Sequence, residues 1–269
     1  MARRRCRKLK LVIGSSVAAL TNFASTAFAM GSGRTAGDWW TPLDHYCERV
    51  GVGFWAEPFN ALTNGAFIVT AAAILIRQQR VASADKQLCV LAILTASVGV
   101  GSFLFHTLAN SWSLIADIVP IAVVIYSFFY LALARFLRLS AAVAGLSTVA
   151  LIVLSPTLET LMKPLLGSSA SYEPGLIATF GVAVAVPVLG RGPMPRLLVA
   201  AGIAFATALM FRMLDAPLCG TWPTGTHFIW HLLNALALGF ALFAAERVRA
   251  GSRLGAVTQP PRQPLADHL

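Results

Sequence analysis

Long apolar stretches alternate with short polar connections along most of this chain. An α-helix needs about 20 predominantly apolar residues to cross the hydrocarbon core of a bilayer. Seven stretches approach that length, at 59–77, 87–109, 112–134, 139–158, 174–190, 197–214 and 225–245. The fifth is the shortest and contains Pro187. The pattern therefore predicts an all-α fold, an integral membrane bundle of seven transmembrane helices.

The two ends of the chain differ from this pattern. Six Lys and Arg residues precede an apolar run over 11–24, and Ala27-Phe28-Ala29 gives a small-x-small motif. Such an arrangement is typical of a secretory signal peptide, here 1–29, with an uncleaved anchor helix as the alternative. Residues 30–250 are expected to form the seven-helix domain. The proline-containing segment 251–269 is expected to be a disordered cytoplasmic tail.

Composition and charge agree with a membrane protein. The chain has 57% hydrophobic and 12% charged residues and a mean hydropathy of +0.71. Its net charge of +10 comes from short basic clusters beside the apolar runs, so neither a nucleic acid nor a protein partner is predicted. If seven spans alternate, eleven of the cations after the signal region face one side and four the other. The positive-inside rule then places the mature N-terminus outside and the C-terminus in the cytoplasm. Arginine-rich composition with a signal suggests a bacterial inner membrane.

Two cysteines fall in segments that face the exterior under this topology. Cys47 precedes the first span and Cys219 precedes the last. In an oxidising compartment they can form a disulfide that ties the N-terminal segment to the loop before the last helix. Two free thiols are the alternative.

Ionisable residues gather at the predicted outer ends of three spans. His227 and His231 stand four apart on one face of the last helix, His106 ends the second span, and Asp117 begins the third. Three histidines and a water make a catalytic zinc site with an open position. Asp117 could then orient that water or accept its proton, and Ser102, one turn before His106, could donate a hydrogen bond to a substrate carbonyl.

Each feature also has a less specific interpretation. The histidine pair could bind haem or hydrogen-bond to a neighbouring helix. Ser102 could be a small residue that permits close helix packing, and Asp117 could pair with a backbone donor. The zinc interpretation is favoured because all these residues fall at the same end of their helices.

In combination, these motifs resemble the alkaline ceramidase family, part of a superfamily of seven-helix membrane hydrolases that includes the adiponectin and progestin receptors. The resemblance covers roughly residues 38–246. It is carried by Tyr46-Cys47-Glu48, the segment from Trp55 to Asn64, the segment from Gly99 to His106, Asp117, and the segment from His227 to His231.

The resemblance implies roles for these residues. His106, His227 and His231 match zinc ligands, Asp117 matches the carboxylate beside the zinc-bound water, and Ser102 matches the residue that contacts the scissile amide. The implied reaction is hydrolysis of a ceramide-like lipid from the membrane to a fatty acid and a sphingoid base. Hydrolysis of another N-acyl lipid, or a non-enzymatic receptor with structural zinc, are the alternatives.

Some members of the family bind calcium through an acidic segment before the first helix. Glu48 and Glu57 match its glutamates, and Asp44 can supply a further oxygen. The match is incomplete, because Asp44 is displaced by one position and Val50 replaces an asparagine. A calcium ion takes six to eight oxygens, so the alternative is a solvated acidic rim.

Overall fold

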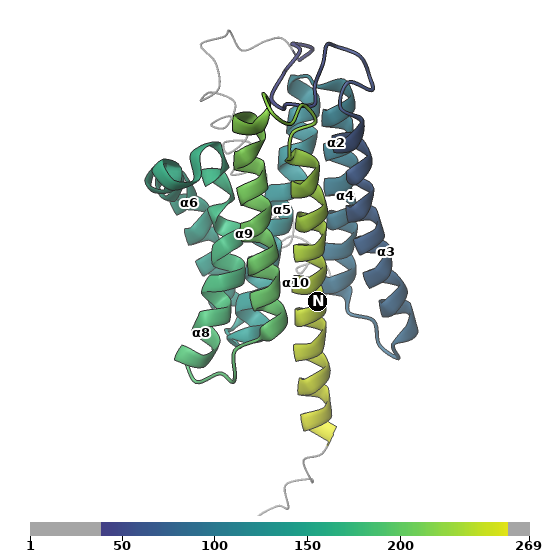
Figure 1. Ribbon diagram of the computed structural model, residues 1–269. Helices are drawn as coiled ribbons and strands as arrows, with labels where there is room; N and C mark the ends of the chain where they lie inside the picture. Colours follow the sequence, from purple (N-terminus) through teal and green to yellow (C-terminus); the bar gives the residue numbers. More distant parts are fainter. Residues whose placement is uncertain (1–38, 258–269) are drawn as a thin grey trace, which may run out of the picture.

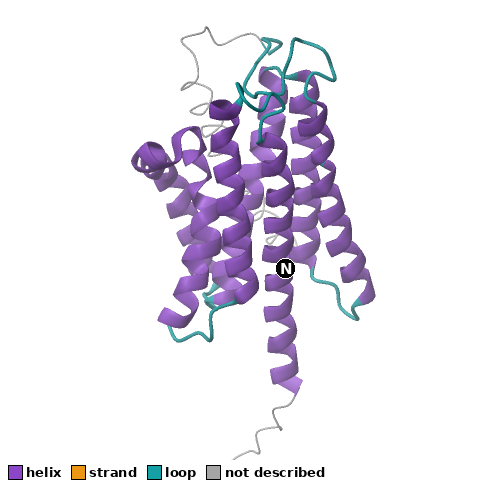
Figure 2. Cartoon of the chain, viewed as in Figure 1, coloured by secondary structure: helices purple, strands orange, loops and turns teal. Residues whose placement is uncertain are grey.

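The computed structural model describes residues 39–257, and within this range the chain folds into a bundle of helices (Figure 1; Figure 2). The helices run roughly side by side, and the longer loops lie at the end of the bundle shown at the top (Figure 2). The elements are α2 (Pro58–Thr63), α3 (Gly65–Arg80), α4 (Lys86–Leu108), α5 (Ser111–Phe136), α6 (Ala141–Leu166), the 3₁₀ helix η1 (Gly167–Tyr172), α7 (Glu173–Leu176), the π-helix η2 (Ile177–Gly181), α8 (Val182–Val188), α9 (Arg196–Leu218) and α10 (His227–Val257). The all-α prediction is confirmed for this part of the chain.

Six helical runs among the described residues are long and apolar enough to cross a membrane. They are Pro58–Arg80, Lys86–Leu108, Ser111–Phe136, Ala141–Val188, Arg196–Leu218 and His227–Arg249. The sequence predicted seven, and the difference lies in the 48-residue run Ala141–Val188, which contains both the fourth and the fifth predicted stretches. This run is interrupted by η1 and η2, and α6, α7, η2 and α8 all contact α5.

The connection between α4 and α5 sets the position of two expected site residues. Only Ala109 and Asn110 join the helices, and Ala109 adopts a left-handed conformation with φ of 41°. The Asn110 side chain accepts a hydrogen bond from the Ser113 amide, and the Ser113 hydroxyl accepts one from the Asn110 amide. This capping box begins α5 immediately after the turn. The last turn of α4 and the first turns of α5 therefore lie at the same end of the bundle.

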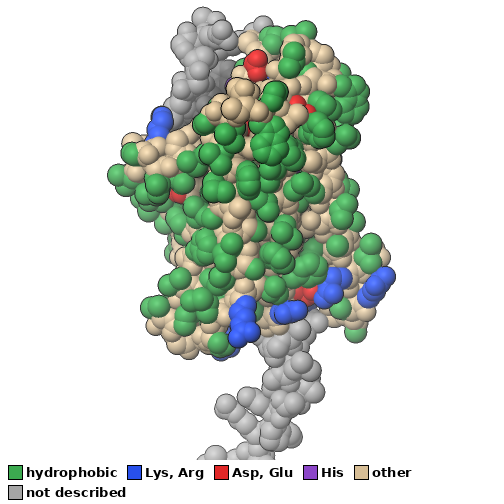
Figure 3. All heavy atoms as spheres, viewed as in Figure 1, with side chains coloured by type: hydrophobic (Ala, Val, Ile, Leu, Met, Phe, Trp, Pro, Cys, Tyr) green, Lys and Arg blue, Asp and Glu red, His purple; other side chains and the backbone are tan. Residues whose placement is uncertain are grey.

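Charge and hydrophobicity are distributed as expected for a protein in a bilayer. Apolar side chains cover the flank of the bundle in view, and basic side chains collect at the end opposite the long loops (Figure 3). At that end Asp85 pairs with Arg135 at 2.7 Å and with Arg249 at 2.9 Å. α10 continues to Val257, so its end falls inside the segment that the sequence assigned to a disordered tail. The predicted signal peptide and residues 258–269 lie outside the described residues.

The segment before α2 folds over the loop end of the bundle. A disulfide joins Cys47 to Cys219, whose Cα atoms are 5.2 Å apart, as the sequence predicted. The Cys47 amide also donates to Asp215 Oδ2 at 3.0 Å. These links hold the N-terminal segment against the end of α9, directly above the start of α10.

Candidate metal site

Three histidines converge at the loop end of the bundle. His106 comes from the last turn of α4, and His227 and His231 come from the first turns of α10. One ring nitrogen of each lies within 4.8 Å of those of the other two, and all three residues are buried. The four-residue spacing on α10 points both of its rings to the same side. The structure thus brings together the three histidines that the sequence singled out.

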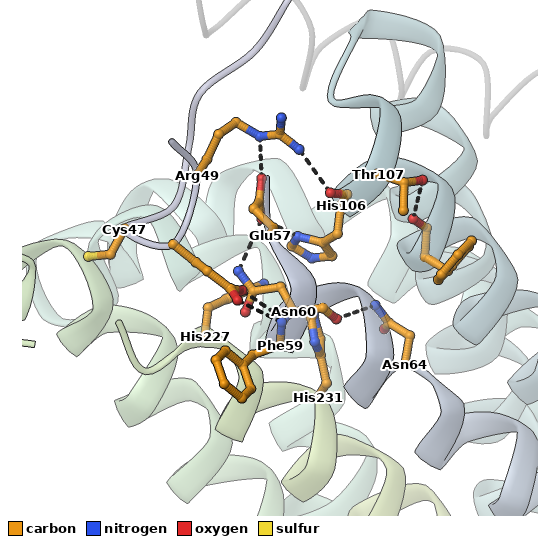
Figure 4. Close-up of polar contacts among 12 residues, drawn as sticks. Cys47, Arg49, Glu57, Phe59, Asn60, Asn64, His106, Thr107, His227 and His231 are labelled. Atoms are coloured by element: carbon orange, nitrogen blue, oxygen red, sulfur yellow. Dashed lines mark hydrogen bonds and ion pairs between the residues drawn. The ribbon is translucent and has the colours of Figure 1, made fainter. Parts of the chain in front are cut away.

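The ring of His106 is oriented by a buried carboxylate. Its Nδ1 lies 2.5 Å from Oε2 of Glu57, which also accepts a hydrogen bond from the Asn60 side chain (Figure 4). Oε1 of Glu57 pairs with the Arg49 guanidinium. Burial alone would raise the pKa of Glu57, but the contacts with His106, Asn60 and Arg49 outweigh it and hold the pKa below its usual value. An ionised Glu57 accepts the proton of Nδ1 and leaves the lone pair of His106 on Nε2.

A threonine on α2 does the same for His231. Thr63 Oγ1 lies 3.0 Å from His231 Nδ1, and it donates its own hydrogen to the Phe59 carbonyl at 2.7 Å. A hydroxyl has only one hydrogen, so Thr63 must accept from Nδ1 of His231. The lone pair of His231 is therefore on Nε2. In both rings Nε2 is buried without a hydrogen-bond partner.

His227 is held by its backbone and by a stacked ring. Its amide and that of Thr226 both donate to Asp215 Oδ1, at 2.9 and 2.7 Å, which begins α10. The ring of Tyr46 stacks on the His227 ring with centroids 3.6 Å apart and an angle of 18°. Nδ1 of His227 is buried and unpartnered. The N-terminal segment and α9 thus fix the third histidine.

Asp117 and Ser102 face each other across the contact between α4 and α5. Asp117 is 7% and Ser102 is 3% exposed, and the Ser102 side chain hydrogen-bonds to the Asp117 carboxyl. Gly101 makes this approach possible, because a Cβ there would fall well inside contact distance of the Ala116 carbonyl oxygen. The glycine next to Ser102 therefore provides the close helix packing, and the serine has a polar partner. Oδ1 of Asp117 has no hydrogen-bond partner.

Arg212, a half-buried arginine that the sequence indicated only as one of the outward-facing cations, lies near the histidines. The Arg212 guanidinium lies 5.1 Å from the Tyr172 ring and 6.0 Å from the Trp230 ring, and it donates to Ser169 Oγ at 2.8 Å. Neither Arg212 nor Asp215, Thr63 and Tyr46 was expected at the site. Tyr46 and Thr63 lie in segments that carry the family resemblance, but their contacts with the histidines join residues far apart in sequence, 168 residues in the case of Thr63 and His231, so local spacing does not indicate these roles.

An apolar cavity lies within the bundle on the membrane side of the histidines. Its walls come from α3, α4, α5, α7, η2, α9 and α10 and include Phe67, Val98, Val124, Phe205 and Ala237. Asn234, three residues after His231 on α10, also lines it. One edge of the cavity is therefore within one helical turn of a histidine of the site.

The acidic residues considered for calcium do not converge in the way the histidines do. Asp44 is exposed. Glu48 accepts hydrogen bonds from the amides of Phe59 and Asn60, at 2.6 and 2.8 Å, and so caps the first turn of α2. Burial raises the pKa of Glu48. Both oxygens of Glu57 are engaged as described above, and among the described residues the only group able to hold a metal consists of the three histidines.

The donor set of the three histidines fits a metal ion. One ring nitrogen of each histidine lies close to those of the other two, and two of the rings are held by a carboxylate or a hydroxyl on the opposite nitrogen, which is the arrangement that metal-ligating histidines show in proteins. Unpartnered buried nitrogens are costly unless something binds them. The fold and this site together define a helical bundle of the multi-pass membrane type, with three histidines that could bind a metal ion next to a carboxylate.

The sequence profile of the Ceramidase family matches residues 44–257, which is most of the chain and includes every residue of the site. The chain belongs to the Ceramidase family, which confirms the resemblance noted from its motifs, and the protein is a hydrolase that acts on an amide bond. No curated protein matches the chain.

Proposed function

We propose that this protein is a zinc-dependent amidohydrolase that cleaves ceramide-like lipids to a sphingoid base and a free fatty acid. The observation that carries the proposal is the group of three buried histidines, each with an unpartnered ring nitrogen, beside the Ser102 and Asp117 pair, in a chain of the Ceramidase family. The three-histidine set favours zinc, which accepts imidazole ligands in a tetrahedral site with one open position.

The residues of the site divide the chemistry among them. A bound zinc ion would supply a Lewis acid for the amide carbonyl and lower the pKa of a water molecule. Asp117 would take the proton from the attacking water with its unpartnered oxygen and return it to the leaving amine. On substrate binding, the Ser102 hydroxyl, which is bonded to Asp117 in the free protein, would turn its single hydrogen toward the substrate carbonyl oxygen. His106, His227 and His231 would be the zinc ligands.

The apolar cavity supports a lipid substrate. Its side chains are almost all hydrophobic, and one of its lining residues, Asn234, lies within one helical turn of His231, so an acyl chain could lie in it with its amide near the histidines. Burial of a long chain favours binding by about 0.8 kcal/mol for each methylene group. An N-acyl lipid fits this cavity better than a water-soluble amide does.

We further propose that the chain crosses the membrane seven times. A single helix of 48 residues would be about 70 Å long, more than twice the thickness of the hydrocarbon core. The contacts of both halves of Ala141–Val188 with α5 and the interruption at η1 support two crossings. Cations concentrated at the opposite end would face the cytoplasm, which places the site on the outer side, with a bacterial inner membrane as the expected location.

Hydrolysis of defined lipids tests this function. Purified full-length protein in detergent is incubated with N-acyl sphingosines, N-acyl ethanolamines and a short water-soluble amide, and released fatty acid and amine are quantified by mass spectrometry. We expect release of a sphingoid base, lost in Asp117→Asn. Preference for another N-acyl lipid would keep the mechanism and change the substrate. The absence of hydrolysis of all N-acyl lipids by zinc-loaded protein would contradict the proposal.

A further inference from the structure

A buried arginine occupies the segment for which calcium was expected. The side chain of Arg49 is 4% exposed, and its guanidinium has three oxygen partners. Nε pairs with Glu57 Oε1, one terminal nitrogen donates to the His106 carbonyl at 2.8 Å, and the other lies 3.4 Å from the Gly51 carbonyl. Figure 4 shows the guanidinium above Glu57 and next to the end of α4.

These contacts leave few free oxygen ligands for a divalent cation. A calcium ion needs six or more oxygens, usually with several carboxylates. The carboxylate of Glu57 already faces one positive group, that of Glu48 accepts two backbone amides, and Val50 supplies no side-chain oxygen. Oδ1 of Asn60 is buried without a partner, but one neutral oxygen is far short of such a set. A divalent ion beside Glu57 would also be repelled by the guanidinium. The residues present therefore do not fit calcium.

The arginine is connected to His106 in two ways, through the Glu57 carboxylate and through the His106 carbonyl. Glu57 is shared between Arg49 on one oxygen and the Nδ1 of His106 on the other. Arg49 also donates a hydrogen bond to the backbone carbonyl of His106 itself. The guanidinium therefore contacts both the Glu57 carboxylate, which orients the His106 ring, and the backbone that carries this ring. Guanidinium donors have a fixed planar geometry, so this arrangement restricts the position of Glu57 more tightly than a flexible ammonium would.

We propose that Arg49 is the built-in cation of this segment, a positioning residue that holds Glu57 against His106 so that the metal site does not depend on bound calcium. The catalytic part of this inference rests on the proposed function. The absence of a calcium requirement does not, because it can be measured by binding alone.

The decisive experiment uses the wild-type protein in detergent. Samples treated with a calcium chelator and then dialysed against micromolar to millimolar calcium are compared for bound calcium, melting temperature and lipid hydrolysis. We expect no stoichiometric calcium and no change in melting temperature. A ligand at about one hundred times its dissociation constant would raise the melting temperature by several degrees. One tightly bound calcium per chain, or a calcium-dependent rise in melting temperature, would overturn the proposal.

Variants of Arg49 test its positioning role. In Arg49→Gln we expect weaker zinc retention against a chelator and a kcat reduced by roughly tenfold or more with little change in KM, since the oriented His106 and not the lipid cavity is disturbed. Arg49→Lys should recover part of the zinc retention and part of the kcat. Arg77→Gln is the matched control, because Arg77 pairs with Glu246 at the other end of the bundle. Unchanged zinc retention in a folded Arg49→Gln protein would refute the positioning role. Calcium-independent protein that hydrolyses no lipid would contradict only the proposed function.

Discussion

Glu57 lies between a guanidinium and an imidazole, with Oε2 2.5 Å from Nδ1 of His106. This relationship connects the segment before the first span to the last turn of α4, and it determines which nitrogen of His106 faces the other two histidines. Partners of this kind are often as important as the ligands themselves, because they fix both the tautomer and the orientation of the ring.

Replacement of Glu57 should weaken metal binding without removing a ligand. Glu57→Gln keeps the shape of the side chain but loses the charge that accepts from Nδ1, so we expect zinc affinity to fall by about 10–100-fold. Competition with a chromophoric chelator measures it. Glu246→Gln, which alters a surface pair with Arg77, is the control and should bind zinc as the wild type does. Wild-type affinity in Glu57→Gln would show that the carboxylate does not support the site.

Variants of Asp117 and His231 should distinguish a loss of catalysis from a loss of metal binding. Asp117→Asn is expected to retain most of the zinc and to reduce kcat by about 10²–10⁴-fold, because the amide cannot accept the proton of water. His231→Ala should lose both the metal and the activity. Zinc content and turnover are measured on the same preparations. Full turnover in Asp117→Asn would exclude its role as the proton acceptor.

Gly101 should matter for activity because of helix packing. In Gly101→Ala the added Cβ meets the Ala116 carbonyl, so α4 and α5 must move apart. This movement increases the distance between Ser102 and Asp117. We expect a stability loss of about 1–3 kcal/mol and a lower kcat. Gly145→Ala on α6, where the space around the Cβ is open, should be neutral or slightly stabilising. Melting curves and turnover distinguish the two variants, and equal behaviour would show that the contact is not required.

The sequence predicted most of the helices and the convergence of the three histidines, for physical reasons. Apolar length and cation placement depend only on local composition, and the spacing of His227 and His231 determines that they share a face. The orientation of His106 by Glu57 could not be predicted, because it depends on the path of the N-terminal segment over the bundle. The family resemblance implied a calcium site at Glu48 and Glu57, but their partners are two backbone amides, the Asn60 side chain, a histidine and an arginine.

Asp85, at the end of the bundle opposite the histidines, makes the stability of the protein depend on pH. Burial alone would raise its pKa, but Arg135 and Arg249 outweigh burial and keep the pKa below the usual value. A carboxyl with a lowered pKa in the folded state contributes stability above its unfolded pKa, near 4, and loses it as the pH falls through the folded value. We therefore expect Asp85→Asn to melt lower than wild type at pH 7, and the difference to shrink below about pH 4. A difference that stays constant between pH 7 and pH 3 would contradict the assignment.

Metal content measured by mass spectrometry on detergent-purified protein tests the central claim most directly. The wild type should contain about one zinc per chain, as expected for a site of three histidines with an open position. His106→Ala, His227→Ala and His231→Ala should each lose it while remaining folded. Carefully prepared wild-type protein that binds no zinc, or that binds it equally well in all three variants, would contradict the assignment of these histidines as the metal site.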